Sequence, residues 1–290
     1  MAGPLLAVDA PSLLYRAFFA LPKSIKGVDG RPVNALLGTA NLVLQAVELH
    51  APRAVVLCFG AEAAHYRVEL YGGYHADRPE MPAELVPQWE DAPAFFEAFG
   101  WRVLAHETLE ADDLLGALAR AEVAAGGRAL LFTGDRDMFQ CVGEQVGVLW
   151  PGGGRAGPEL IDRDGVRERY GIEPGQVPDF IALRGDPSDG IPGAKGIGEK
   201  GARDLLREHG TLEALLEAAQ RATALKPRVA ETLRTQAQEL RRFKDIATLR
   251  PVDVERPPDA PLDAAGAAAA ASERGMGRLA GRLEQLAARA

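Results

Sequence analysis

The stretch Arg128-Ala-Leu-Leu-Phe-Thr-Gly-Asp-Arg-Asp137 is a short apolar run that ends in two acidic residues. The apolar run follows Gly126-Gly127, a pair that ends a helix, and it predicts a buried strand. Asp135 and Asp137 come directly after that strand. In an open parallel sheet, ligands bind in the crevice at the carboxyl ends of the strands. This stretch therefore predicts an α/β sheet with acidic residues at its ligand-binding edge.

Strands and helices alternate on both sides of this stretch. Four further strands are expected at Leu5 to Asp9, Ala54 to Phe59, Trp101 to Ala105 and Gln145 to Trp150. Helices are expected from Asn34, as the N-cap, to about His50, and from Glu110 to about Ala125. This alternation predicts an α/β fold with a mostly parallel central sheet and helices on both faces.

The chain divides into three regions by composition. Residues 1–155 form the predicted α/β core, which includes an excursion rich in Tyr, Pro and charge between Glu62 and Gly100. Residues 156–255 have short helical patterns and Gly-rich turns, which predict a helical lobe. Residues 256–290 are rich in Ala and Pro, and we expect a flexible segment followed by a short terminal helix.

Composition indicates a globular protein of the cytoplasm. Hydrophobic residues make up 47% of the 290 residues, enough for a large core, and Cys58 and Cys141 sit in apolar runs typical of buried reduced thiols. The sequence lacks an apolar run long enough for a membrane span and has no secretion signal at its start. A net charge of −8 argues against nucleic acid as a partner unless many of the acids belong to a metal site.

The acidic residues of interest fall at predicted strand ends and at the junction with the helical lobe. They are Asp9, Glu110, Asp112, Asp113, Asp135, Asp137, Asp186 and Asp189. Carboxylates that converge repel one another and are tolerated when cations neutralise them. Oxygen ligands without a Cys or His cluster favour Mg²⁺ or Mn²⁺, and this many acids predicts two ions about 4 Å apart. Taken singly, each group also fits a structural role, as helix-dipole partners at residues 110–113 or as turn residues at 135–137.

The segment Ile191-Pro-Gly-Ala-Lys-Gly-Ile-Gly-Glu-Lys-Gly-Ala202 predicts a helix-hairpin-helix element, at about residues 186–209. Gly196 and Gly198 let the backbone approach a phosphate closely, and the second helix presents free N–H groups at its start. Lys195 and Lys200 add positive charge at the same edge. Such an element grips the backbone of a DNA strand without reading bases.

In their order and spacing, these motifs resemble the 5′-nuclease (flap endonuclease) superfamily from about Leu5 to about Leu249. The likeness is to the 5′–3′ exonuclease domain of bacterial DNA polymerase I, here as a stand-alone protein. The resemblance implies a PIN-like core and a helical arch at about residues 65–95. It also implies cleavage of DNA that carries a 5′ flap, nick or 5′ end, K⁺ at the hairpin, and a monomer that shares a pathway with a polymerase and a ligase.

Two positions depart from the family pattern. The family has an Asp metal ligand where this chain has Gly60, which predicts a weaker metal site and better activity with Mn²⁺ than with Mg²⁺; Glu62 lies two residues on. The arch Lys that reaches the scissile phosphate is replaced by His75, so Arg67 and Arg78 become candidate phosphate contacts. These departures leave two alternatives open: a DNA junction binder that cuts poorly, and an RNase of the PIN-like fold.

Overall fold

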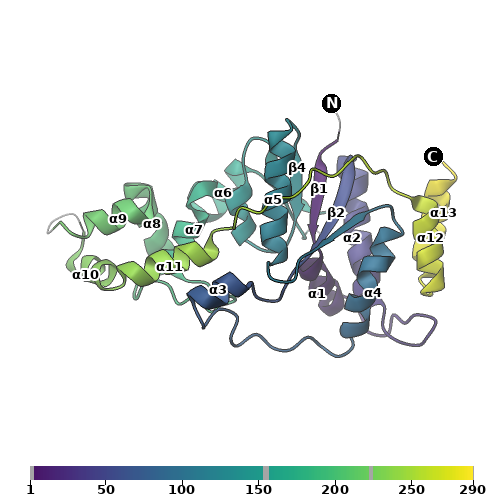
Figure 1. Ribbon diagram of the computed structural model, residues 1–290, viewed down its shortest axis with the longest axis horizontal. Helices are drawn as coiled ribbons and strands as arrows, with labels where there is room; N and C mark the ends of the chain where they lie inside the picture. Colours follow the sequence, from purple (N-terminus) through teal and green to yellow (C-terminus); the bar gives the residue numbers. More distant parts are fainter. Residues whose placement is uncertain (1–2, 153–156, 222–224, 290) are drawn as a thin grey trace.

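The computed structural model of the protein describes residues 3–152, 157–221 and 225–289. Its centre is a six-stranded sheet with the order β3-β2-β1-β4-β5-β6 (Figure 1). The strands are β1 (Leu5–Asp9), β2 (Ala54–Phe59), β3 (Arg102–Ala105), β4 (Ala129–Phe132), β5 (Val146–Trp150) and β6 (Glu159–Ile161). The first five run parallel, and β6 pairs antiparallel with β5. The predicted mostly parallel sheet is confirmed, and β6 is a strand that the sequence did not reveal.

The strand order reverses between β1 and β4. From β1 the chain builds the sheet outward through β2 and β3, and it then returns to the other side of β1 to form β4 and β5. Connections on the two sides of such a point diverge and leave a crevice at the carboxyl ends of the strands. Asp9 ends β1 and Asp135 follows β4, so both acids lie at this crevice.

Side chains of β1 alternate between two hydrophobic cores. Leu5 and Ala7 belong to the core that contains α5 and the helical lobe, whereas Leu6 and Val8 belong to the core that contains α1, α2 and α4. These helices are α1 (Ala10–Ala20), α2 (Asn34–His50), α4 (Val86–Glu97) and α5 (Ala111–Ala124). Both faces of the sheet are therefore covered, as predicted. Asn34 is the first residue of α2 and not its cap; its side-chain amide donates to the carbonyls of Phe18 and Leu21.

A helical lobe extends to one side of the sheet (Figure 1). Its helices are α6 (Arg163–Tyr170), α7 (Val177–Arg184), α8 (Glu199–His209), α9 (Leu212–Ala218), α10 (Pro227–Thr235) and α11 (Ala237–Ala247). Helix α7 is buried along its length and shares a hydrophobic core with α5, through which the lobe joins the sheet. The predicted boundary at residue 155 lies outside the described residues.

The region expected to form a helical arch, residues 65–95, is only partly helical and is not a single unit. It begins with the short helix α3 (His65–Leu70), continues through turns, and ends in α4. Helix α4 does not arch over the site, because Phe95 and Phe96 are fully buried in the α/β core. The segment from α3 to about residue 85 borders the cavity through Arg67, Tyr74, His75 and Arg78, and α4 contributes Trp89 from its first turn.

The Ala-rich tail is more ordered than the sequence suggested. It forms two helices, α12 (Ala264–Glu273) and α13 (Gly277–Ala287), that pack against each other, and α12 also packs against α4. Ala267 and Ala271 are fully buried, because their small side chains let α12 pack closely, and Ala has the highest helix propensity. The Ala-rich centre of the tail lies in α12, and the expected short terminal helix corresponds to α13; the expected flexible segment stays a prediction.

Candidate active site

A cavity of about 530 Å³ opens at the carboxyl ends of β1 and β4. Seven of the eight predicted metal-binding carboxylates line it: Asp9, Glu110, Asp112, Asp135, Asp137, Asp186 and Asp189. Arg67, His75 and Arg78 also line it. Acids that are up to 180 residues apart in the sequence therefore share one cavity. Their role as metal ligands stays a prediction.

Thr133 links the acids that follow β1 and β4. Its hydroxyl donates to Asp9 Oδ2 at 2.6 Å. The hydroxyl oxygen of Thr133 in turn accepts from the Asp135 N–H at 2.9 Å. Asp9 also caps α1 by accepting from the Ser12 N–H at 3.0 Å. Asp135 Oδ1 in turn accepts from the Asp137 N–H at 2.8 Å. These bonds fix the orientation of the carboxylates at the centre of the cavity.

Glu110 stands just before α5 and anchors the opposite wall. Its carboxylate accepts from the Ala64 N–H at 2.7 Å and from the Tyr74 hydroxyl at 2.9 Å, and it pairs with Arg67 at 3.0 Å. Asp112 lies in the first turn of α5, and none of the described residues donates a hydrogen bond to its carboxylate. Asp112 is therefore free to take a ligand from the cavity.

The helical lobe contributes two acids through the loop after α7. Asp186 Oδ1 accepts from the Ser188 N–H at 2.9 Å, and Asp186 Oδ2 accepts from Arg184 at 2.9 Å. Asp189 faces His75, with 3.1 Å between Asp189 Oδ1 and His75 Nε2. The loop thus brings two carboxylates of the lobe against those of the sheet.

Each of the central carboxylates makes the charged form of its neighbours less favourable. Burial, followed by the negative charge of Asp135, raises the pKa of Asp112 well above its usual range, and the same two causes act on Asp137. Burial and the charge of Asp189 raise the pKa of Asp135 to about 7. Burial also raises the pKa of Asp9, against the bond from Thr133. Cations in the cavity would remove this repulsion.

The donor set fits hydrated divalent cations. Among the described residues, no three His, Cys, Asp or Glu side chains are grouped so that they could hold a metal ion by themselves. Mg²⁺ keeps several water ligands and binds proteins through one or two carboxylates together with substrate phosphates. The seven predicted carboxylates are spread over one cavity and do not form a closed cage, an arrangement that suits such hydrated ions.

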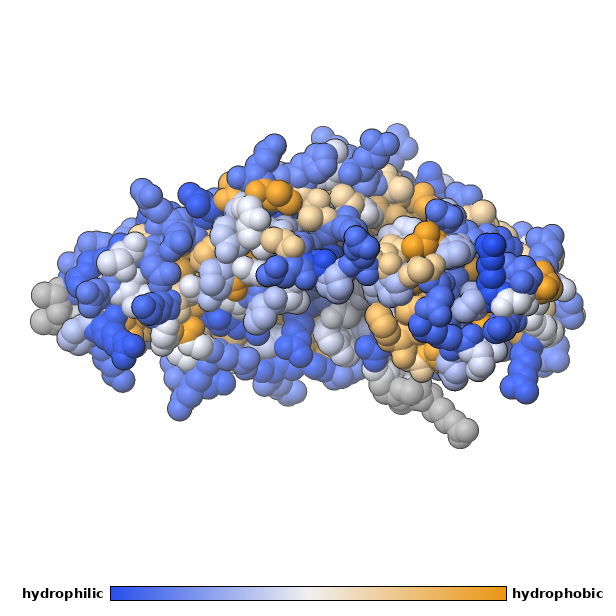
Figure 2. All heavy atoms as spheres, turned by 90° about the horizontal axis from the view of Figure 1, so that it is seen from below, coloured by the Kyte–Doolittle hydropathy of each residue, from blue (hydrophilic) through white to orange (hydrophobic). Residues whose placement is uncertain are grey.

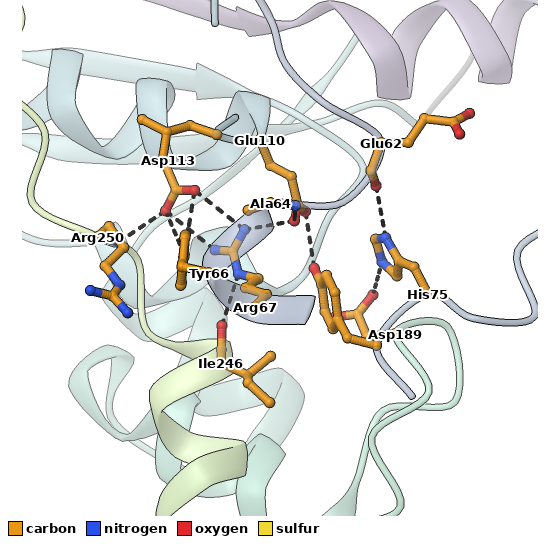
Figure 3. A network of polar contacts seen from close by, with 12 residues as sticks. Glu62, Ala64, Tyr66, Arg67, His75, Glu110, Asp113, Asp189, Ile246 and Arg250 are labelled. Atoms are coloured by element: carbon orange, nitrogen blue, oxygen red, sulfur yellow. Dashed lines mark hydrogen bonds and ion pairs between the residues drawn. The ribbon is translucent and has the colours of Figure 1, made fainter. Parts of the chain in front are cut away.

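Arg67 and Asp113 form a structural pair beside the cavity (Figure 3). Arg67 is only 3% exposed; it contacts Asp113 at 3.3 Å and donates to the Ile246 carbonyl at 2.9 Å. Asp113 is fully buried, does not line the cavity, and also accepts from the Tyr66 hydroxyl and the Arg250 N–H. The pair ties α3, α5 and the end of α11 together. A metal-binding role for Asp113 and a phosphate contact for Arg67 stay predictions, and these contacts favour a structural role for both residues.

His75 lies at the contact between the α3–α4 segment and the helical lobe (Figure 3). Its backbone has a φ of 53°, its Nδ1 is 2.8 Å from the Glu62 carbonyl oxygen, and its ring stacks on Tyr74. Arg78 is exposed and donates to the same carbonyl at 2.9 Å. Of the predicted basic residues over the cavity, Arg78 is thus the one with an accessible charge. The Glu62 carboxylate points away from His75.

Gly60 borders the cavity but offers no room for a side chain. A Cβ at this position would lie 2.5 Å from Ala111 N, Glu110 C and Leu109 O, all of which are backbone atoms. The glycine is explained by the close approach of β2 to the start of α5, and not by a positive φ.

The predicted DNA-binding residues of the hairpin lie outside the cavity. Lys195, Gly196, Gly198 and Lys200 are exposed between α7 and α8, and Gly198 is the N-cap of α8. Gly196 has a φ of 80°, which favours glycine. The Lys195 N–H donates to Gln236 Oε1 at 2.8 Å, so the hairpin rests on the α10–α11 turn.

Sequence reasoning missed residues that orient the acids or shape the cavity: Ser12, Thr133, Tyr74, Arg184 and Trp89. Burial raises the pKa of Tyr74, which keeps its hydroxyl protonated as a donor to Glu110. Thr133 stands next to the acidic motif in the sequence, and its place at the end of a strand was the signal that could have identified it.

None of the helices within the described residues has the length and apolar character needed to cross a membrane. The face seen in Figure 2 is largely hydrophilic, and its apolar residues lie in separate patches.

Comparisons with known proteins agree with this geometry. Residues 4–171 match a family model described as the 5′–3′ exonuclease N-terminal resolvase-like domain, and residues 172–264 match the 5′–3′ exonuclease C-terminal SAM fold. A 5′–3′ exonuclease of Streptomyces coelicolor is 36% identical, over 94% of this chain and 96% of its own. DNA polymerase I of Chloroflexus aurantiacus is 40% identical over 86% of this chain, which spans only 26% of that polymerase.

Solved structures share the fold. The flap endonuclease of bacteriophage T5, in a pseudo-enzyme–product complex with DNA and metal ions, superposes with a TM-score of 0.70 at 17% identity, covering 98% of each chain. Two adjoining family models account for nearly all of the described core and helical lobe. The chain therefore belongs to the 5′–3′ exonuclease family.

Proposed function

We propose that this protein is a metal-dependent nuclease that hydrolyses DNA phosphodiester bonds at 5′ flaps, nicks or 5′ ends. The observation that supports it is one cavity lined by seven of the predicted metal-binding carboxylates, whose mutual repulsion cations would relieve. Two bound divalent ions, Mg²⁺ or Mn²⁺, supply an activated water and stabilise the leaving oxygen in such a reaction.

The residues of the chain divide the work between binding and orientation. Asp9, Asp112 and Asp135 would hold the cations, and Thr133 fixes the carboxylate of Asp9 and the backbone of Asp135. Arg78 has an exposed guanidinium at the cavity and is placed to contact the phosphate of the cleaved strand. His75 holds Asp189 and joins the α3–α4 segment to the lobe.

The hairpin gives the enzyme its grip on the duplex. Exposed Lys195 and Lys200 flank the start of α8, where backbone N–H groups favour a phosphate. We propose that a K⁺ ion at this hairpin adds to the contact. We further propose that the protein acts as a monomer in the cytoplasm, in a replication and repair pathway that also contains a polymerase and a ligase.

The proposal is tested with a 5′-labelled flap DNA incubated with Mg²⁺, Mn²⁺ or EDTA. We expect cleavage with either ion, more with Mn²⁺ because Gly60 supplies no carboxylate, and none with EDTA. Asp112→Asn is the inactive control, and a flap of identical sequence in RNA measures the choice of nucleic acid. Cleavage in EDTA would overturn metal catalysis. Binding without cleavage would identify a junction binder, and cleavage of RNA alone would identify an RNase.

A further inference from the structure

An aromatic side chain without a catalytic role borders the carboxylate cavity. Trp89 of α4 lines the cavity and is partly exposed. Tyr15 and Phe59 contact its indole edge-to-face, at centroid distances of 6.1 and 5.8 Å and interplanar angles of 72° and 87°. Among the described residues, no aromatic ring lies parallel to the indole. The cavity therefore has an aromatic wall in addition to its acidic residues.

The residues on either side of Trp89 are fixed. Gln88 is buried, and its Oε1 accepts from the Ala35 N–H at 2.7 Å at the start of α2. Asp91, two residues further on, accepts two hydrogen bonds from Arg274 of the C-terminal helices, at 2.5 and 2.6 Å. Helix α4 is thus held from both sides, and the indole is positioned before any substrate arrives. A ring ordered in advance loses little entropy on binding.

We propose that Trp89 stacks against an unpaired base of the 5′ strand, next to the phosphate that is cleaved. The inference rests on the proposed nuclease function. A base in a duplex is already stacked on both sides, whereas an unpaired base has a free π-face that any aromatic ring can cover. Because every base has such a face, the contact selects single-stranded DNA without selecting a sequence. Trp89 is thereby a substrate-binding residue that favours flaps over fully paired ends.

The test compares variants of the full chain on two flap substrates that share one duplex. One flap is oligothymidine, and the other has abasic nucleotides throughout, so that only the bases differ. Trp89→Leu keeps apolar packing against Phe59 but removes the ring, and Trp89→Phe restores an aromatic ring. Phe19→Ala is the matched control, because Phe19 is 70% exposed but does not line the cavity. Affinity is measured with the Asp112→Asn substitution present, so that the substrate stays intact.

We expect Trp89→Leu to weaken binding of the thymidine flap on the order of 5- to 150-fold and to leave the abasic flap unchanged. Trp89→Phe should recover most of the affinity, and Phe19→Ala should change neither substrate. Equal loss on both flaps, or no loss on either, would overturn the stacking role. Cleavage of the thymidine flap by the unsubstituted protein is measured in parallel, so that failure of the nuclease function is distinguishable from failure of this inference.

Discussion

At the scale of single residues, Gly60 gives the sharpest test of the cavity wall. A Cβ there would lie 2.5 Å from three backbone atoms of residues 109–111, so any larger side chain displaces the segment that carries Glu110. We expect Gly60→Ala and Gly60→Asp each to lower the free energy of unfolding by about 1–3 kcal/mol, equally with and without Mg²⁺. Denaturant unfolding of both variants measures this. Stabilisation of Gly60→Asp alone by Mg²⁺ would show that the added carboxylate reaches the ion.

Asp112 and Asp113 are adjacent in the sequence, but we expect their substitution by Asn to have different effects on cleavage and on stability. Asp112→Asn should abolish cleavage and leave stability unchanged or higher, because it removes a carboxylate that its neighbours repel. Asp113→Asn should cost on the order of 3 kcal/mol of stability, because it breaks a buried pair with Arg67. Cleavage assays and urea unfolding of both variants check the contrast. If the Asp112→Asn variant is unfolded, Asp112 has a structural role and the prediction is wrong.

The raised carboxylate pKa values predict how stability depends on pH when metal is absent. In the unfolded chain these acids titrate near pH 4, whereas Asp135 titrates at about 7 in the folded protein. Between these values the folded state binds more protons, so this contribution to stability is full below about pH 4 and is lost as the pH rises through about 7. We expect a lower melting temperature at pH 8 than at pH 6 in EDTA, and a flatter profile for Asp135→Asn. A melting temperature that rises over this interval would contradict the prediction.

The sequence located the acids but not the side of the helix on which each lies. Asp112 and Asp113 both belong to one acidic motif, yet consecutive residues of a helix point roughly 100° apart, so only one of them faces the cavity. The buried contacts of Arg67 were not predictable for a related reason. Its burial depends on Ile246 and Asp113, partners that no local pattern reveals.

At the scale of elements, apolar runs predicted the strands well because buried parallel strands are apolar on both faces. Helices were harder to predict where the element that they pack against lies far away in the sequence. The Ala-rich helix α12 has little amphipathic pattern, and its burial becomes visible only in its packing against α4 and α13. Pro and charged residues between positions 62 and 100 suggested an excursion, although the second half of that region packs into the core.

The order of the C-terminal helices can be measured through one buried and one exposed residue of α13. Leu283 is fully buried in the α/β core, whereas Arg282 is exposed. Leu283→Ala should lower the free energy of unfolding by about 2–5 kcal/mol, and Arg282→Ala should change it by less than about 0.5 kcal/mol. Chemical denaturation of the two variants provides the comparison. If neither substitution matters, the tail is not packed in solution.

At the scale of the whole molecule, a protein with a negative net charge is expected to bind DNA through a surface where basic residues are concentrated. The net charge is −8, yet Lys195 and Lys200 are exposed together at the hairpin. Each phosphate neutralised on B-DNA adds about −0.9 to the slope of log affinity against log salt. Replacing both lysines by Ala should flatten the slope by up to about 1.8 on duplexes of any sequence. Exposed Lys26 serves as the control, and an equal change with Lys26→Ala would show a general charge effect.

The two helices at the end of the chain also set the order in which the protein can finish folding. Phe95 and Phe96 share a hydrophobic core with Leu279 and Leu283, so the first domain is closed by the last helices. At a synthesis rate of roughly 5–20 residues per second, α13 leaves the ribosome about 10–40 s after α4. During that interval the nascent chain exposes an aromatic surface that later becomes core. A chain that lacks α12 and α13 is therefore expected to expose the apolar face of α4 and to aggregate more readily than the chain that contains them.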